Sequence, residues 1–282
     1  MPDPFDIKGP AVVSFSGGRT SAYMLWRILQ AHGGSLPDDI SVCFANTGRE
    51  MPATLDFVRD CAAAWSVHVR WLEYRHAPGH PSVVEVSHNS ASRAGEPFEA
   101  LLRSKSMLPN PVSRFCTIEL KIRTMRRFVR DQFGWKHWTN IVGLRADEPG
   151  RIERMGARNA ARKDHFVTAA PLATAGIEEF HVLQFWRQQP FDLRLKGPWE
   201  GNCDGCFLKN RAALERMWLD HPDRMDWWPA MEGLPHGVGA GGTFRADREN
   251  YATMAATVRN QGRLPFDINE KALPCRLAAC GV

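Results

Sequence analysis

The chain has 282 residues, a formal net charge of +5 and a hydrophobic fraction of 44%, which is the composition of a globular protein with a large buried core. No apolar run approaches the length of a membrane span, and the N-terminal stretch MPDPFDIKGP lacks the basic start and apolar segment of a secretion signal. We therefore expect a cytoplasmic protein without a membrane partner. The small positive charge suits an anionic substrate such as a nucleotide and is compatible with nucleic acid.

The first predicted unit is a strand, a glycine turn and a helix. Residues 11–15 are apolar and β-prone, and apolar residues recur at helical spacing from Ala22 to Leu29. Between them, Gly17 and Gly18 allow backbone N–H groups to close around an anion, and the helix start adds further N–H donors. We therefore predict a phosphate site formed by six consecutive residues: Ser16, Gly17, Gly18, Arg19, Thr20 and Ser21.

A second unit repeats this order. A predicted strand over residues 40–45 ends in Asn46, Thr47 and Gly48, and a helix opens at Pro52. This loop would also lie at the carboxyl end of a strand, where open parallel sheets bind their ligands. The two loops together favour one ligand site at this edge of the sheet.

A third strand is predicted over residues 67–72. Residues 75–114 then lack periodicity, which indicates a lid or a substrate-specific insertion with a short helix near residues 97–103. A helix follows over about residues 114–133, and one of its faces is basic: Lys121, Arg123, Arg126, Arg127 and Arg130. This face is either solvated or a contact for the phosphates of a nucleotide or nucleic acid.

A fourth strand, over residues 138–142, precedes Gly143, Arg145 and Arg151. Arginine suits an anion site because its planar fork pairs bidentately with phosphate or sulfate. A further helix is predicted over about residues 177–187. We place a boundary near residue 170, between an N-terminal nucleotide-binding α/β domain (1–170) and a C-terminal helical or irregular lobe (171–282).

The seven cysteines are odd in number and unevenly spaced, which argues against a disulfide framework. Cys43 lies within a predicted strand and Cys61 within a predicted helix, so we assign both to the core. Cys203 and Cys206 form a C-x-x-C in a turn of glycine, asparagine and aspartate, which can place two thiolates on one metal or cluster. A redox dithiol is the alternative, although that motif normally opens a helix in a thioredoxin-like unit.

Three of these stretches resemble the signatures of one family. SFSGGRTS resembles the S-G-G-x-[DST]-S phosphate loop of the ATP pyrophosphatases and the phosphoadenylylsulfate (PAPS) reductase family, and NTGREMPATLDFV and GLRADEPGRI resemble the second and third signatures of that family. The resemblance implies an α/β fold of adenine nucleotide α-hydrolase type, with a parallel sheet, flanking helices and a smaller cysteine-bearing lobe. It implies Arg19, Arg145 and Arg151 as catalytic residues, and nucleotide binding by Ser14, Ser16, Gly17, Gly18, Arg19, Thr20, Ser21, Asn46, Thr47, Gly48 and Gly143.

The cysteines resemble those of the iron–sulfur branch of the same family. That branch holds a [4Fe–4S] cluster on four cysteines, which here would be Cys116, Cys203, Cys206 and Cys275. A zinc ion on the same thiolates is the alternative. Cys275 is favoured as the fourth ligand by its Pro-Cys context, and Cys280 is the alternative.

We expect an enzyme of sulfur chemistry that binds ATP, PAPS or adenylylsulfate (APS), with Mg²⁺ assisting at the phosphates. Thr20 stands where many loops of this superfamily carry aspartate, which leaves two activities open: ATP-dependent sulfur transfer and reduction of PAPS or APS. A nucleic-acid-binding module with a structural zinc site is a third hypothesis. The partners implied are nucleic acid as sulfur acceptor, a protein that donates sulfur or electrons, and a second copy of the chain.

Overall fold

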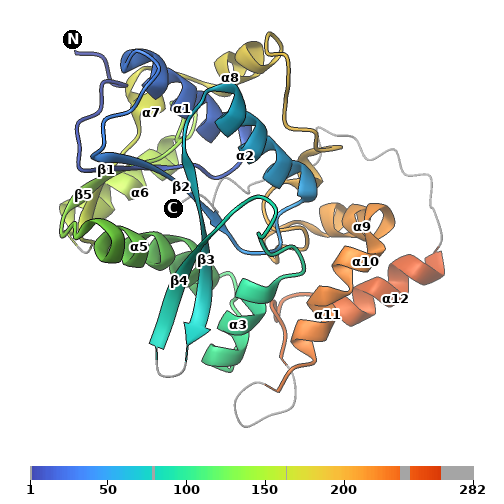
Figure 1. The fold of residues 1–282 in the computed structure, drawn as a ribbon. Helices are drawn as coiled ribbons and strands as arrows, with labels where there is room; N and C mark the ends of the chain where they lie inside the picture. The colour runs from blue at the N-terminus through green and yellow to red at the C-terminus, as the bar shows by residue number, and fades with distance from the viewer. Residues whose placement is uncertain (1, 78–79, 163, 236–241, 262–282) are drawn as a thin grey trace.

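The computed structural model describes residues 2–77, 80–162, 164–235 and 242–261, and its centre is a six-stranded sheet (Figure 1). The strand order is β4-β3-β2-β1-β5-β6, and every neighbouring pair is parallel except β3 and β4. The strands are β1 (Ala11–Ser14), β2 (Ile40–Asn46), β3 (Val69–Ala77), β4 (His80–Val86), β5 (Trp138–Ile141) and β6 (Phe166–Ala169). The predicted fold class, a parallel α/β sheet with flanking helices, is confirmed.

The helices fall into two groups along the chain. Those that connect the strands or flank the sheet are α1 (Arg19–Ala31), α2 (Pro52–Ala64), α3 (Glu96–Lys105), α4 (Phe115–Thr117), a π-helical turn η1 (Ile118–Arg123), α5 (Thr124–Phe133), α6 (Pro149–Ala160), α7 (Pro171–Thr174) and α8 (Glu179–Trp186). The second group comprises the 3₁₀ turn η2 (Pro198–Glu200), α9 (Arg211–Asp220), α10 (Pro222–Met225), α11 (Trp227–Glu232) and α12 (Tyr251–Gln261). None of the helices in the described ranges combines the length and apolar character needed to cross a membrane.

The chain order of the strands reverses beside β1. From β1 the chain continues to β2 and β3 on one side, and it returns to place β5 and β6 on the other side. Because β1 and β5 are parallel neighbours, their carboxyl ends meet at one edge of the sheet. A crevice at such a reversal point is where open α/β sheets bind ligands.

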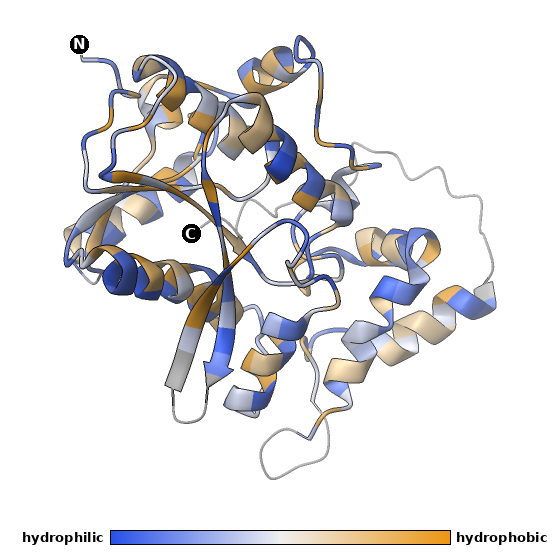
Figure 2. Cartoon of the chain, viewed as in Figure 1, coloured by the Kyte–Doolittle hydropathy of each residue, from blue (hydrophilic) through white to orange (hydrophobic). Residues whose placement is uncertain are grey.

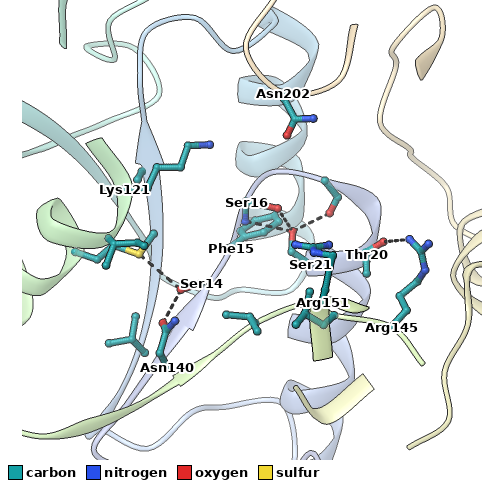
Figure 3. Close-up of a pocket in the computed structure, with 18 of the residues that line it drawn as sticks. Ser14, Phe15, Ser16, Thr20, Ser21, Lys121, Asn140, Arg145, Arg151 and Asn202 are labelled. Atoms are coloured by element: carbon teal, nitrogen blue, oxygen red, sulfur yellow. Dashed lines mark hydrogen bonds between the residues drawn. The ribbon is translucent and has the colours of Figure 1, made fainter. Parts of the chain in front are cut away.

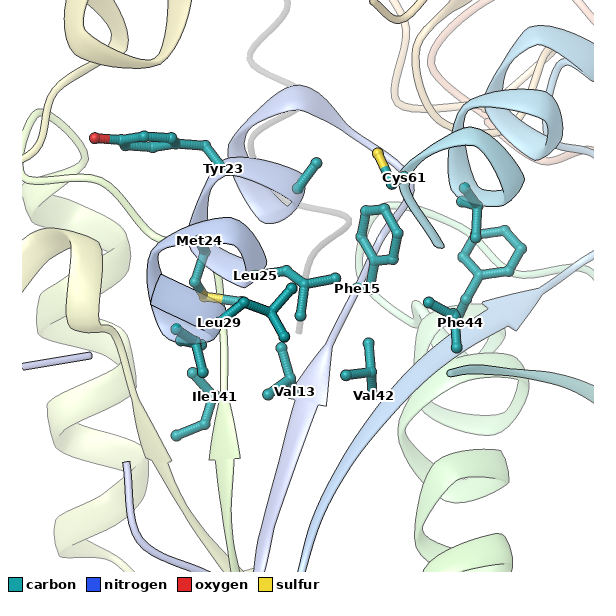
Figure 4. Packing of buried hydrophobic residues seen from close by; sticks show 14 of the residues in the cluster. Val13, Phe15, Tyr23, Met24, Leu25, Leu29, Val42, Phe44, Cys61 and Ile141 are labelled. Carbon is teal, nitrogen blue, oxygen red and sulfur yellow. The ribbon is translucent and has the colours of Figure 1, made fainter. Parts of the chain in front are cut away.

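Both faces of the sheet are covered by apolar side chains, as alternation along each strand requires. Val13 points into a large core with α1 and α2 (Figure 4), whereas the neighbouring Val12 packs on the opposite face with Phe128 and Val129 of α5. The orange segments of the central strands and of α1 in Figure 2 follow this burial. Helices α1 and α5 therefore fix the carboxyl edge of β1 from opposite faces.

Two cysteines belong to this packing, as predicted. Cys43 of β2 and Cys61 of α2 are both 0% exposed. Burial raises the pKa of the Cys43 thiol to about 12 and that of Cys61 well above its ordinary value. Both thiols are therefore protonated core groups and not metal ligands.

A second core joins α3 to the C-terminal helices. Its largest buried side chains include Phe98 of α3, Trp228 of α11 and Tyr251 of α12. Apolar residues as late as Leu193 still pack in the first core, with α1 and α2. The domain boundary at residue 170 remains a prediction, and the change from the first core to the second falls after Leu193.

The segment predicted as a lid is partly a sheet edge. The chain turns after β3 and returns as β4, the single antiparallel strand, which pairs with β3 along its length. The predicted short helix within this segment is present as α3. Helix α6 and strand β6 were not predicted. Helix α6 has no buried residue and so no apolar face in its sequence, and β6, with four residues, is too short to show a clear alternation.

Candidate functional site

The turn between β1 and α1 is built around Gly17. Its φ of +77° lies in the left-handed region, and a Cβ there would lie 2.7 Å from the Thr54 side chain of α2. The turn is closed by Ser21, whose Oγ donates to the Gly18 carbonyl (3.0 Å) and accepts from the Ser16 N–H (3.2 Å). The chain can therefore pass close to α2 only with glycine at position 17.

The start of α1 is left open. Gly18 is its N-cap residue, no side chain caps the first turn, and no acidic residue lies in that turn. The first N–H groups of a helix have no partner within the helix, and the helix dipole places partial positive charge there. In this chain these donors face a cavity.

The cavity has a volume of about 440 Å³ and opens at the carboxyl ends of β1 and β5 (Figure 3). Apolar side chains from the strands and from the η1–α5 segment form one part of the lining: Val12, Trp138, Val142, Phe166, Ile122 and Met125. Polar groups form the other part: Ser14, Ser16, Arg19, Thr20, Ser21, Lys121, Arg126, Asn140, Arg145, Glu148, Arg151, Glu179 and Asn202. Gly18 and Gly143 also line it, so the structure brings most of the predicted nucleotide residues together.

Carboxylates hold the three predicted arginines. Arg19 forms a fork with Asp192, with an Nε–Oδ1 distance of 2.7 Å, and Arg145 forms one with Asp147, with an Nε–Oδ1 distance of 2.8 Å. The hydrogen bond from Arg145 lowers the pKa of the Asp147 carboxyl. Arg151 pairs with Glu148, whose other oxygen accepts the backbone N–H of Arg145. Arg145 and Arg151 are thus held by one short segment, whereas Arg19 ties α1 to the chain that follows α8.

Asn46, Thr47 and Gly48 do not line this cavity. The Asn46 amide is fully buried and donates to Glu73 (Oε1, 2.6 Å) and to the Ser92 carbonyl (2.9 Å). Its Oδ1 accepts the Gly48 N–H at 3.1 Å, so both ends of the amide are used inside the protein. Thr47 of this loop instead lines a second, smaller pocket.

Three of the predicted metal ligands line that second pocket. Cys116, from the start of the α4–α5 segment, lies there with Cys203 and Cys206. Thr47 Oγ1 is 3.6 Å from Cys203 Sγ, and Arg114 and Lys121 complete the polar lining. Within the described ranges no three His, Cys, Asp or Glu side chains are arranged to hold a metal ion. Cys275 and Cys280 lie outside the described residues.

The loop that carries Cys203 and Cys206 is fastened to the loop after β2. Glu50 and Cys203 form an antiparallel bridge, and the Asp204 N–H donates to the Arg49 carbonyl at 2.9 Å. The side chains of the same two residues, Arg49 and Asp204, form a buried ion pair with an Nη2–Oδ2 distance of 2.6 Å. Burial lowers the pKa of the Arg49 guanidinium, and the Asp204 charge opposes that shift.

The predicted basic face is divided between two roles. Arg123 and Arg127 pair with the buried Glu119, which also receives Lys105, and Arg130 pairs with its neighbour Asp131. Burial alone would raise the pKa of Glu119, but hydrogen bonds from Arg127 and Lys105 lower it overall. The remaining two, Lys121 and Arg126, line the large cavity. The face is therefore not one continuous strip for nucleic acid.

Several polar residues of the cavity were not assigned to the nucleotide site from sequence, among them Asn140, Lys121 and Asn202. Asn140 interrupts an apolar strand and receives the Ser14 hydroxyl at 2.7 Å, so its signal was a polar residue within a buried strand. Lys121 lines both pockets, but it was one of several basic residues on its helix. Asn202 directly precedes Cys203, and the cysteine motif drew the interpretation of that turn away from the nucleotide site.

No protein-family model matches this chain. Among curated proteins it is similar to the uncharacterized nin region protein ORF290 of Escherichia phage lambda, with 34% identity over 210 residues, 72% of this chain and 67% of the relative. Among solved structures it is similar to a PAPS reductase from Candida auris in a phosphate complex (TM-score 0.38, 15% identity, 66% of this chain and 79% of that chain). It is also similar to the U34-tRNA thiolase NcsA from Methanococcus maripaludis with its [4Fe-4S] cluster (TM-score 0.40, 14% identity, 93% of this chain and 77% of that chain).

Proposed function

The chain belongs to the family of the nin region protein ORF290 of phage lambda, and we propose that it is an enzyme that binds an adenine nucleotide by its phosphates. The observation that carries this proposal is the uncapped start of α1, which follows the Gly17–Gly18 turn and faces the cavity beside β1 and β5. Backbone N–H groups and the helix dipole favour an anion at such a position.

The mixed lining of the cavity supports a nucleotide over a simple anion. Its volume of about 440 Å³ lies within the range of small-molecule sites. Val12, Trp138 and Phe166 offer apolar surface for a base, while Ser16 and the arginines offer polar groups for phosphates. We propose that Arg145 and Arg151 contact the anionic end, and that Mg²⁺ bound with the nucleotide would supply further positive charge for the phosphates.

We propose a sulfur chemistry for the enzyme from the second pocket. We propose that Cys116, Cys203 and Cys206, which line this pocket together with Arg114 and Lys121, supply thiolate ligands to a metal or cluster. With Cys275 as the fourth ligand, such a set suits a [4Fe–4S] cluster, or zinc as the alternative. When bound, a cluster would supply electrons or an iron atom that binds sulfur.

The reaction we propose is ATP-dependent sulfur transfer. An oxygen of the acceptor attacks the α-phosphorus of ATP, and the bond to the departing pyrophosphate breaks. A hydrosulfide then attacks the adenylated carbon, AMP leaves with the oxygen, and the S–H proton is released to solvent. The N–H groups of α1 and the arginines would stabilise charge on the phosphates during the first step. The net charge of +5 is compatible with nucleic acid as the acceptor class.

Reduction of PAPS or APS is the second candidate. It is supported by the absence of a carboxylate from residues 16–21, where ATP-cleaving loops of this superfamily often carry aspartate. In this reaction a two-electron donor cleaves the sulfur–oxygen bond, and sulfite and the nucleotide are released. Because the nucleotide site is shared, only the products separate the two activities.

The test is anaerobic purification followed by calorimetric titration with ATP, PAPS and pyrophosphate, and then by product analysis. Formation of AMP and pyrophosphate only when an acceptor is present would support sulfur transfer, and release of sulfite would support reduction. If none of the three ligands binds, the proposed nucleotide site is wrong. Iron, sulfide and zinc analysis of the same preparation distinguishes a cluster from a zinc site.

A further inference from the structure

Asn202 directly precedes Cys203 and lines the large cavity. Gly201 and Asn202 line the large cavity, whereas Cys203 and Cys206 line the small cysteine pocket. Successive residues of one turn thus face two different sites. In Figure 3 the Asn202 amide projects into the cavity from a segment far in sequence from the Ser16–Ser21 loop.

The backbone of Asn202 is held in an uncommon conformation. Its φ of +61° lies in the left-handed region, which asparagine tolerates better than most residues but glycine adopts more easily. In the described part of the chain its side-chain amide has no hydrogen-bond partner, so the conformation is not explained by a contact within the protein. Left-handed residues that a fold maintains without such a contact are concentrated at ligand sites.

The two residues that follow Asn202 are held in place by contacts with the loop after β2. The bridge between Glu50 and Cys203 holds the next residue, and the buried pair of Arg49 and Asp204 holds the one after it. A side chain presented from so rigid a segment loses little freedom when it binds a ligand. The backbone position from which the Asn202 side chain projects is therefore set before a nucleotide arrives.

From this geometry we propose that Asn202 binds the phosphate chain of the nucleotide from the side opposite the start of α1. This inference rests on the proposed nucleotide function and adds a ligand contact that comes from the cysteine loop. The amide N–H would donate to a phosphate oxygen, a hydrogen bond strengthened by the charge on its acceptor. The nucleotide would then be enclosed between the N-terminal phosphate loop and the turn that carries Cys203.

The test is Asn202→Gly, because glycine keeps the left-handed backbone and removes only the amide. Ser66→Gly is the matched control, since Ser66 is also left-handed (φ 52°) but is exposed after α2 and does not line the cavity. Calorimetric titration with ATP and with inorganic pyrophosphate should show affinity about tenfold weaker for both ligands in Asn202→Gly. The Ser66→Gly variant should bind like the parent protein.

Three outcomes would be decisive. If the parent protein binds neither ATP nor pyrophosphate, the proposed function itself fails. If the parent binds both and Asn202→Gly binds them equally well, the role of Asn202 is overturned and the nucleotide site stands. A loss for ATP with unchanged pyrophosphate affinity also overturns the contact to phosphate. Unchanged thermal midpoints for both glycine variants would show that folding is not the cause of any loss.

Discussion

The Arg49 guanidinium and the Asp204 carboxylate form a buried ion pair that connects the loop after β2 to the turn between Cys203 and Cys206. Asp204 also receives Arg224 at 2.9 Å and the Trp228 indole N–H at 2.9 Å. Four segments of the chain therefore meet at one carboxylate. The stretch that resembles a nucleotide signature serves here as the support of the cysteine turn.

Removal of one partner of this pair should destabilise the protein strongly. We expect Arg49→Met to lower the free energy of unfolding by about 3 kcal/mol, because the buried Asp204 carboxylate loses one of its two cationic partners and the Ala94 and Arg224 carbonyls lose their donor. Urea denaturation followed by tryptophan fluorescence would measure it. The control is Arg59→Met, whose pairs with Asp56 and Asp60 are at the surface and should contribute less than about 1 kcal/mol. Equal effects of the two changes would contradict this view of the pair.

The two glycines of the turn between β1 and α1, Gly17 and Gly18, should differ in their tolerance of alanine. At Gly17 a Cβ would lie 2.7 Å from Thr54 Cγ2 at a left-handed φ, so we expect Gly17→Ala to destabilise the protein by about 1–3 kcal/mol and to weaken ATP binding. At Gly18 the nearest atom, Ser16 Oγ, would be 3.8 Å away, and the backbone φ is −103°. Gly18→Ala should therefore change stability by less than about 1 kcal/mol. Thermal unfolding and ATP titration of both variants would check the contrast, and a Gly17→Ala protein of parental stability would refute it.

The Glu119 cluster should make stability depend on pH. Hydrogen bonds from Arg127 and Lys105 hold the pKa of the folded carboxyl below its ordinary value. Its contribution is therefore complete above about pH 4.3, the unfolded pKa, and is lost as the pH falls through the folded pKa. We expect Glu119→Gln to cost about 1–3 kcal/mol at neutral pH and much less near pH 3. Urea denaturation at both pH values would measure this. A difference that stays constant with pH would contradict the assignment, and Glu99→Gln, which loses only a surface pair with Arg103, provides the control.

The cysteines of the small pocket should differ from those of the core in metal content. We expect Cys116→Ser and Cys203→Ser each to lower the iron or zinc bound per chain to less than about half, because each removes one of the four proposed ligands. Cys43→Ala should retain the parental metal content, since that thiol is buried beside the sheet. Metal analysis of anaerobically purified variants provides the measurement. Parental metal content in both pocket variants would exclude this pocket as the metal site.

The local parts of the fold could be predicted from sequence because their signals are local. The apolar run before Ser16, the glycine pair and the helical period after Ser21 specify β1, the turn and α1 without reference to the rest of the chain. The cysteine motif was likewise recognisable from its spacing. Strand β4 was missed because its sequence, HPSVVEV, begins with histidine and proline, and its place at the sheet edge depends on its neighbour β3.

The arrangement of the candidate site could not be predicted in the same way. Asn46 follows a strand end as the nucleotide loop does, but its side chain turns toward Glu73 and Ser92 and away from the cavity. Which side a loop faces depends on the segments packed against it, here Glu73 in β3 and the chain after β4. Asn202 illustrates the same limit, since its place at the cavity depends on the bridge between the next residue, Cys203, and Glu50.

The contacts of Arg19 bear on whether the sheet half of the molecule is an autonomous module. Its guanidinium is held by Asp192 and by the Leu193 carbonyl, and its own carbonyl receives the Trp186 indole N–H. The first turn of α1 is thus held by hydrogen bonds to residues beyond position 170. A fragment cut there would lose those supports and uncover the apolar surface that Trp186 protects. The sheet half should therefore be inherited, exchanged or engineered together with the chain up to at least Leu193.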